Sequence, residues 1–168
     1  LGAAGGGIAG TLVSQLKNGK ADLTMTINGI LAGLVSVTAG CDAVGTVGAW
    51  VMGFIGGVIV VYSVALIDKL RIDDPVGAFS VHGAGGIWGT LAVGLFSKEA
   101  GFFYGHGLNQ FFVQLVGVVA YGLCTVALSY VTWKFLAKAN KGLRVGEEEE
   151  ILGLDASEHG MNAYTYNG

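Results

Sequence analysis

Long apolar runs alternate with short polar segments along most of this 168-residue chain. Runs of this length, without the two-residue alternation of a barrel strand, favour helices. We expect five apolar helical segments, over residues 1–16, 23–40, 43–67, 76–96 and 107–136. The first is expected to be a partial span, and the other four are close to or above the roughly 20 apolar residues that cross a bilayer. The pattern predicts an all-α, polytopic membrane protein.

Composition agrees with a membrane setting. Hydrophobic residues make up 52% of the chain and charged residues 12%, whereas a soluble domain carries about 25% charge. The 30 glycines favour helices whose backbones touch, and two pairs have the four-residue spacing of such contacts: Gly29 with Gly33, and Gly53 with Gly57. Because the chain starts inside an apolar run, without the basic start of a signal peptide, we expect it to be the C-terminal part of a longer protein.

The basic residues predict an orientation. If the first segment ends in the cytoplasm, the loops and tail on that side carry eight of the nine basic residues, namely Lys17, Lys20, Lys69, Arg71, Lys134, Lys138, Lys141 and Arg144. Only Lys98 lies outside, which is the positive-inside pattern. We therefore expect a multi-pass protein of the cell membrane, with residues 1–141 in membrane helices and residues 142–168 in a cytoplasmic tail.

His82 is the one ionisable side chain within the uncharged run 76–96. An ionisable group at membrane depth is costly and by default marks a transport or proton pathway. The alternative is a histidine that is hydrogen-bonded to a neighbouring helix for packing. After His82, a strip of glycines is expected to let another helix approach closely: Gly85, Gly86 and Gly89.

The start of this segment carries a capping signal. Asp74 is expected to cap the free amides of the helix, with Pro75 at the first helical position and Asp73 at the interface. In the second segment, an apolar stripe with a polar residue near each end recurs at helical spacing, over Asn28, Leu31, Leu34 and Thr38. This stripe fits pore lining, and it fits interhelical hydrogen bonding by Asn28 and Thr38 equally well.

Three groups of residues, in order, resemble the ammonium transporter family (Amt/Mep, related to Rh proteins). The late-helix motif is Asp73-Asp74-Pro75 through Val81-His82-Gly83, then Gly86 and Gly89. An earlier helix is similar over Asn28-Gly29, Ala32-Gly33-Leu34-Val35 and Thr38-Ala39-Gly40-Cys41. The tail is similar over Gly142-Leu143-Arg144-Val145, Glu147 to Glu150, Gly153-Leu154-Asp155, His159-Gly160 and Ala163-Tyr164, as in the microbial and plant Amt branch.

The resemblance implies an eleven-helix fold in which this chain covers the end of the seventh helix and the eighth to eleventh. It implies a homotrimer with one pore per subunit, carrying ammonium or ammonia, with methylammonium as an analogue. His82 would be the second histidine of a pore pair. The candidate pore residues are His82, Asn28, Leu31, Leu34, Thr38, Ala78 and Phe79.

The tail would be regulatory and would bind a PII-type signalling protein in such relatives. The tail candidates are Arg144, Glu147, Glu148, Leu154 and Asp155, with Leu152 and Leu154 able to dock on the membrane helices. We expect no enzymatic activity, no cofactor, no metal site and no nucleic-acid partner, since the chain has no nucleophile triad, phosphate-binding loop or zinc spacing. An ammonium sensor with the same membrane domain is the alternative function, and a purely structural membrane subunit is a third.

Overall fold

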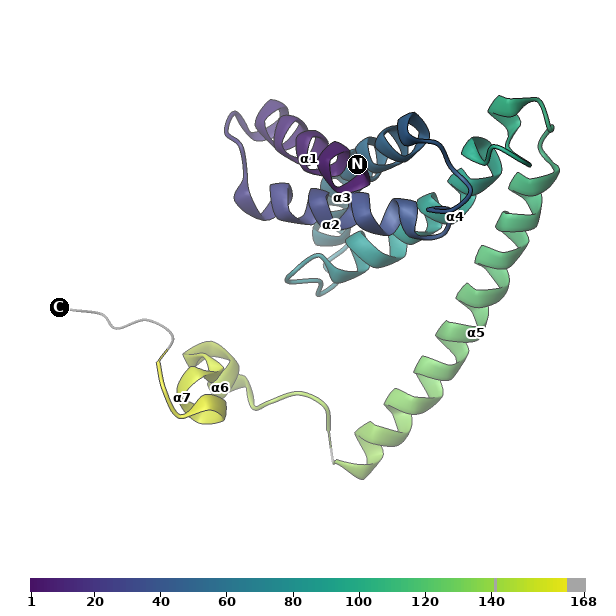
Figure 1. Cartoon of the computed structure of the whole chain (residues 1–168). Helices are drawn as coiled ribbons and strands as arrows, with labels where there is room; N and C mark the ends of the chain where they lie inside the picture. Colours follow the sequence, from purple (N-terminus) through teal and green to yellow (C-terminus); the bar gives the residue numbers. More distant parts are fainter. Residues whose placement is uncertain (141, 163–168) are drawn as a thin grey trace. The chain divides into compact units, whose positions relative to one another are not determined.

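The computed structural model describes residues 1–140 and 142–162, so the predicted tail residues Ala163 and Tyr164, and the basic residue Lys141, lie outside the described residues. Within that part of the chain the regular elements are all helical, and the only strand-like feature is the isolated bridge between Val44 and Ser97 (Figure 1). The helices are α1 (Gly2–Asn18), α2 (Leu23–Thr38), α3 (Thr46–Lys69), the π-helical turn η1 (Phe79–Ala84), α4 (Gly85–Phe96), the 3-10 turn η2 (Phe102–Tyr104), α5 (Asn109–Ala139), α6 (Glu147–Leu152) and α7 (Leu154–His159). The predicted all-α class is confirmed.

The elements form two compact units, Leu1–Gly122 and Leu123–Gly168, which we describe separately. The boundary falls inside α5, a continuous helix up to Ala139. The predicted division after residue 141, between membrane helices and tail, stays a prediction.

Three of the described helical segments are long and apolar enough to cross a membrane: Thr46–Lys69, Phe79–Phe96 and Asn109–Ala139. Helix α2 is apolar but has 16 residues, because the chain turns after Thr38, where the amide of Gly40 donates to the carbonyl of Val37. The sequence predicted four full spans, so α2 is shorter than expected. At its other end, the carboxylate of Asp22 caps α2 by accepting from the amide of Met25 at 3.0 Å.

Glycines bring α1, α2 and α3 into backbone contact in the first unit. Gly6 of α1 lies against Gly29 of α2 and Gly57 of α3, so that a Cβ at any of the three would collide with backbone atoms. Gly2 makes the same contact one turn earlier, against Gly33 and Gly53. These are the four-residue glycine pairs of the sequence, and their close approach is the packing that small residues permit in lipid.

Helix α2 and the segment η1–α4 run parallel, side by side. Asn28 lies beside Val76, Ala32 beside Gly85, Ser36 beside Gly89, and Gly40, just past the end of α2, beside Val93. From Ala32 and Gly85 onward, the contacts advance four residues at a time on both segments. The start of α2 and the start of η1 are therefore at the same end of this unit. The two basic loops that precede them, at residues 17–20 and 69–71, share that end, since Lys17 and Asn18 line the same hollow as Asp68.

The second unit contains the last part of α5 and two short helices. The side chain of Glu149 accepts from the amide of Gly146 at 3.4 Å and so caps the start of α6. The guanidinium of Arg144 lies 4.0 Å from the carboxylate of Glu150, and both side chains are largely exposed. Exposed pairs at this separation contribute little to stability.

Candidate functional site

His82 lies in a π-helical turn. The sequence predicted an ordinary helix over residues 76–96, but Phe79–Ala84 form the wider π-turn, and the α-helical part begins at Gly85. His82 is the fourth residue of this turn and its side chain is exposed in the first unit. Single π-turns within helices are uncommon and occur frequently at functional sites.

The chain enters this turn through a tight bend at Asp74–Gly77. The amide of Gly77 donates to the carbonyl of Asp74 at 3.0 Å, with Pro75 at the second position of the bend, where its fixed φ fits a β-turn. Gly77 has a φ of +72°, a conformation that favours glycine. Pro75 is therefore part of the turn before the helix and not its first helical residue, which corrects the sequence-based expectation.

Asp74 makes the hydrogen bonds of a capping residue from this bend. Its Oδ1 accepts from the amide of Phe79 at 3.1 Å, and its Oδ2 accepts from the amide of Ser80 at 3.2 Å. These amides lie at the start of the helical segment, where donors have no acceptor within the helix. Asp73, the other carboxylate of the motif, is exposed.

Two serines absent from the predicted site join this cap to another helix. The hydroxyl of Ser63 on α3 donates to the hydroxyl of Ser80 at 3.1 Å, and Ser80 Oγ donates to Asp74 Oδ2 at 3.2 Å. Ser80 is fully buried. Both serines can be read from the sequence, each within an apolar segment. No local pattern, however, indicates that two residues 17 positions apart are hydrogen-bonded to each other.

Asn28 and Thr38, the polar residues at the two ends of the predicted α2 stripe, make different hydrogen bonds. Asn28 is 5% exposed, and its Nδ2 donates to the carbonyl of Val76 at 3.2 Å, which links α2 to the loop before η1. Thr38 is exposed, and its hydroxyl donates to Leu34 of its own helix at 2.8 Å. The hydrogen-bonding interpretation therefore describes Asn28, while Thr38 makes no interhelical bond among the described residues.

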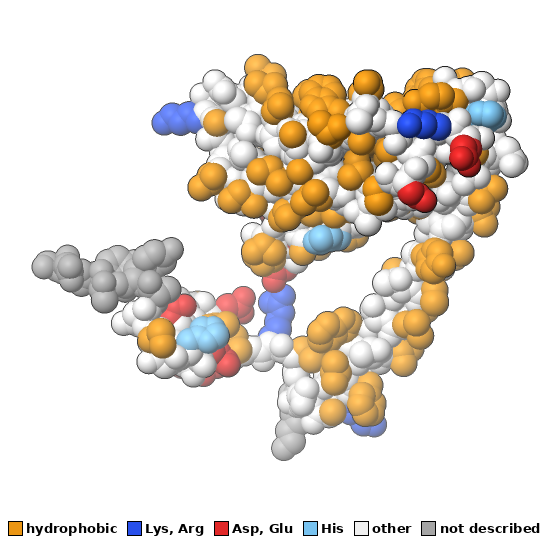
Figure 2. Space-filling view, in the orientation of Figure 1, with side chains coloured by type: hydrophobic (Ala, Val, Ile, Leu, Met, Phe, Trp, Pro, Cys, Tyr) orange, Lys and Arg blue, Asp and Glu red, His pale blue; other side chains and the backbone are white. Residues whose placement is uncertain are grey.

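The other predicted pore residues are on the surface of the first unit. Leu31 and Leu34 of α2 are exposed, as are Ala78, Phe79 and His82 around η1. The ring of Phe79, 56% exposed, lies along the turn, since a Cβ at Gly83 would fall 2.8 Å from its Cε2 atom. Apolar side chains are spread widely over the surface that Figure 2 presents. His82 is thus an exposed imidazole on the same turn as the exposed apolar side chain of Phe79.

The glycine strip after His82 is not uniform. A Cβ at Gly89 would fall 2.6 Å from the carbonyl oxygen of Ser36, so α2 and α4 are in backbone contact there. At Gly85 and Gly86 the nearest atoms would be 3.8 Å away, in ordinary van der Waals contact. The predicted close approach is therefore made by Gly89, and Gly85 and Gly86 leave room for a methyl group.

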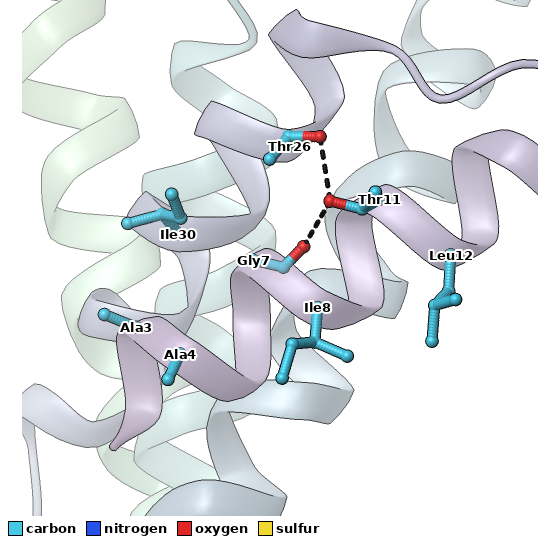
Figure 3. A pocket seen from close by; sticks show the side chains of 8 residues that line it. All are labelled: Ala3, Ala4, Gly7, Ile8, Thr11, Leu12, Thr26 and Ile30. Carbon is cyan, nitrogen blue, oxygen red and sulfur yellow. Dashed lines mark hydrogen bonds between the residues drawn. The ribbon is translucent and has the colours of Figure 1, made fainter.

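A separate apolar groove lies between α1 and α2 and contains none of the predicted site residues (Figure 3). It has a volume of about 470 Å³ and is lined by Ala3, Ala4, Gly7, Ile8, Thr11, Leu12, Thr26 and Ile30. Its polar atoms are satisfied internally, because the hydroxyls of Thr11 and Thr26 are 2.9 Å apart and Thr11 donates to the carbonyl of Gly7 at 2.8 Å. This groove offers no charged or ionisable side chain to a ligand.

The tail candidates are exposed residues of the second unit. Glu147 and Glu148 open α6, and Arg144 pairs with Glu150 as described above. Leu154 begins α7 and is 37% exposed, and the carbonyl of Asp155 accepts from the amide of Met161. Across residues 1–140 and 142–162, no three His, Cys, Asp or Glu side chains gather into a group that could hold a metal ion.

Comparison with known proteins gives one consistent family. The sequence profile of the Ammonium Transporter Family matches residues 1–164. The chain is similar to ammonium transporter Amt2 of Archaeoglobus fulgidus, at 37% identity over 98% of this chain and 37% of that protein.

Two solved structures have a similar fold. One is a sensor Amt protein, with a TM-score of 0.81 and 32% identity over 94% of this chain and 39% of its own. The other is Mep2 of Saccharomyces cerevisiae, with a TM-score of 0.82 and 28% identity over 99% of this chain and 41% of its own. The chain therefore spans only a little over a third of the length of these relatives.

Proposed function

Because the chain belongs to the ammonium transporter family, we propose that it forms part of the wall of a membrane pore for ammonium or ammonia, with His82 in the conduction path. The observation that carries this proposal is an exposed imidazole on a π-turn, within the apolar segment Phe79–Phe96 of membrane-spanning length. In this proposal, the wall of the pore opposite His82 and the partner histidine belong to protein outside this chain.

The chemistry of the proposed pore follows from the cost of burying charge. An ammonium ion that enters an apolar passage loses its water with no charged partner to replace it, which is strongly unfavourable. Ammonia, being neutral, avoids most of that cost, and the proton needs a carrier. Imidazole suits that role because its unperturbed pKa is near 6.5 and both ring nitrogens can bind a proton.

The apolar character of the other candidate pore residues supports a passage and not a binding cage. The candidate pore residues other than His82, Asn28 and Thr38 are exposed apolar side chains without charge, namely Leu31 and Leu34 on α2 and Ala78 and Phe79 just before His82. Such a wall disfavours a bare cation and imposes little penalty on a small neutral molecule. Under this proposal the role of Asn28 is structural, since its side-chain amide is buried and donates to the carbonyl of Val76.

We also propose how the protein is oriented in the membrane and how it assembles, as the resemblance to the family implies. The basic loops at residues 17–20 and 69–71 lie at one end of the first unit, which supports a cytoplasmic assignment for that end. The tail, from residue 142 onward, would lie on the same side of the membrane. A homotrimer and a PII-type partner for the tail belong to this proposal.

His82→Ala in the full-length transporter tests the function. We expect methylammonium uptake to fall sharply or its selectivity to change, while the amount of protein inserted in the membrane stays normal. Trp88→Phe is a suitable control for a change in a large side chain of α4. The Nε1 of Trp88 donates to the carbonyl of Met52 at 2.9 Å, so this side chain packs against α3. An unchanged rate and selectivity in His82→Ala would refute the proposed role.

An ammonium sensor is the second candidate, favoured by the likeness to a solved sensor Amt protein. A sensor would bind ammonium and change its contacts with a signalling partner without passing substrate at a significant rate. Uptake by the purified protein in liposomes separates the two, because only a transporter accumulates labelled methylammonium inside the vesicles.

A further inference from the structure

We infer that Asp74, Ser80 and Ser63 form a positioning network that sets the orientation of His82, an inference that rests on the proposed function. None of the hydrogen bonds within this network ends on the imidazole, and the effect of the network is transmitted through the backbone of η1. They are therefore positioning residues and not members of the pore lining.

The network begins with the carboxylate of Asp74, which accepts three hydrogen bonds. Two come from backbone amides, of Phe79 at 3.1 Å and Ser80 at 3.2 Å, and the third comes from Ser80 Oγ at 3.2 Å. Both oxygens are engaged, so the carboxylate is held in one rotamer. A negative charge is also favourable here, at the N-terminal end of a helical segment.

Ser63 connects this cap to α3. Its hydroxyl donates to Ser80 Oγ at 3.1 Å, and Ser80 then donates onward to Asp74, so donors and acceptors are ordered in one direction. Ser80 is fully buried, and a buried hydroxyl that loses a partner costs more than an exposed one. The link fixes the rotation of the first residues of η1 relative to α3.

The next residue in the turn is anchored by packing. Val81 is 2% exposed and belongs to the core cluster with Ala32, Val60 and Val61. Ser80 and Val81 are thus held on the buried side of η1 by hydrogen bonds and by apolar contact. The following residue is His82, which is exposed, so the direction of its side chain is determined by how firmly these two are held.

The need to orient His82 explains why Asp74, Ser80 and Ser63 carry linked polar groups among apolar membrane-length segments. Neither serine hydroxyl meets substrate in the proposed pore, so the effect of the network on transport acts through His82. A proton carrier, however, must present its ring nitrogens to the path within a narrow range of angles, and small displacements of an active group cost large factors in rate.

The test uses Ser63→Ala and Ser80→Ala in the full-length transporter, with Ser36→Ala as the matched control. Ser36 is also a fully buried serine, but its hydroxyl donates at 2.6 Å to Ala32 of its own helix. We expect the maximal rate of methylammonium uptake per folded protein to fall about three- to tenfold in the network variants, the equivalent of one hydrogen bond. We expect the half-saturating concentration to stay unchanged, and Ser36→Ala to keep the wild-type rate.

Two further variants, and the choice of Ser63→Ala itself, separate this inference from a folding effect. Ser63→Thr keeps the hydroxyl and is expected to retain the rate. Ser63→Ala leaves both amide bonds to Asp74 in place, so it tests the network even if Ser80→Ala does not fold. In a His82→Ala background, Ser80→Ala is expected to cause no further loss, because residues acting through one group are non-additive.

The outcomes also separate this inference from the proposed function. Wild-type uptake in His82→Ala would refute the pore role, and the positioning role with it. Loss of uptake in His82→Ala together with wild-type rates in both serine variants would refute the network alone. A loss in the serine variants that only follows the amount of folded protein would also refute it.

Discussion

Gly85 and Gly89 of α4 form a matched pair that tests how closely this helix approaches α2. Both are buried and lie about one turn apart on the same helix. A Cβ at Gly89 would fall 2.6 Å from the carbonyl oxygen and 2.8 Å from the Cα of Ser36, whereas a Cβ at Gly85 would lie 3.8 Å from Ala32. Ordinary Cβ contacts begin at 3.4 Å, so only Gly89→Ala requires α2 to move.

The size of the effect follows from two opposing terms. Replacing glycine by alanine inside a helix stabilises it by about 1 kcal/mol through the lost flexibility of the unfolded backbone, and this gain is common to both variants. Overpacking costs about 1–3 kcal/mol, and the upper part of that range is expected at Gly89 because its neighbours are backbone atoms that cannot rotate away. The free energy of unfolding of Gly89→Ala should therefore lie about 2–3 kcal/mol below that of Gly85→Ala.

The measurement is unfolding of the full-length transporter in mixed micelles, titrated with SDS and followed by tryptophan fluorescence. Comparing the two variants with each other removes the shared helix-propensity term. Equal unfolding free energies for Gly85→Ala and Gly89→Ala would show that α2 and α4 are not in backbone contact at Ser36, and the parallel packing described above would be wrong at that turn.

Other parts of the molecule give further expectations. Asp22→Ala removes the cap on the amide of Met25 and should lower the free energy of unfolding by about 1 kcal/mol, while Asp22→Asn keeps most of it; equal losses in the two would contradict capping. Glu150→Gln breaks the exposed pair with Arg144 and should leave the thermal midpoint of unfolding unchanged. A loss of stability as large as that of Asp22→Ala would contradict the small contribution expected of this pair. In the tail, Leu154→Asp should reproduce part of the effect of deleting the chain after Gly142, namely slower uptake or lost PII sensitivity in transport and pull-down assays. Full uptake and full PII sensitivity in both would show that the tail is passive.

Local pattern predicted most of the helical architecture. The apolar runs predicted the five long helical segments, because hydrophobicity is a property of each residue and needs no knowledge of its neighbours in space. The spacing of Gly29 with Gly33 and of Gly53 with Gly57 likewise predicted close helix contacts, and the structure places these glycines against α1. His82 was recognisable as unusual from the chain alone, since an ionisable group stands out in an uncharged membrane-length run.

The details around His82 depended on tertiary structure. Local spacing predicted neither the π-turn at Phe79–Ala84 nor the bend that removes Pro75 from the helix. The bend also lies against α2, where a Cβ at Gly77 would fall 2.7 Å from Nδ2 of Asn28. The bond between Ser63 and Ser80 joins two helices, so it exists only when their rotation and register are set.

The glycines after His82 show the same division between local and tertiary information. Gly85, Gly86 and Gly89 are alike in sequence, but only Gly89 faces the backbone of Ser36. The sequence alone determined that these helices would form and that small residues would let them pack closely. Which glycine bears the contact was decided by the parallel register of α2 and α4, because steric exclusion acts between atoms brought together in space and not between neighbours along the chain.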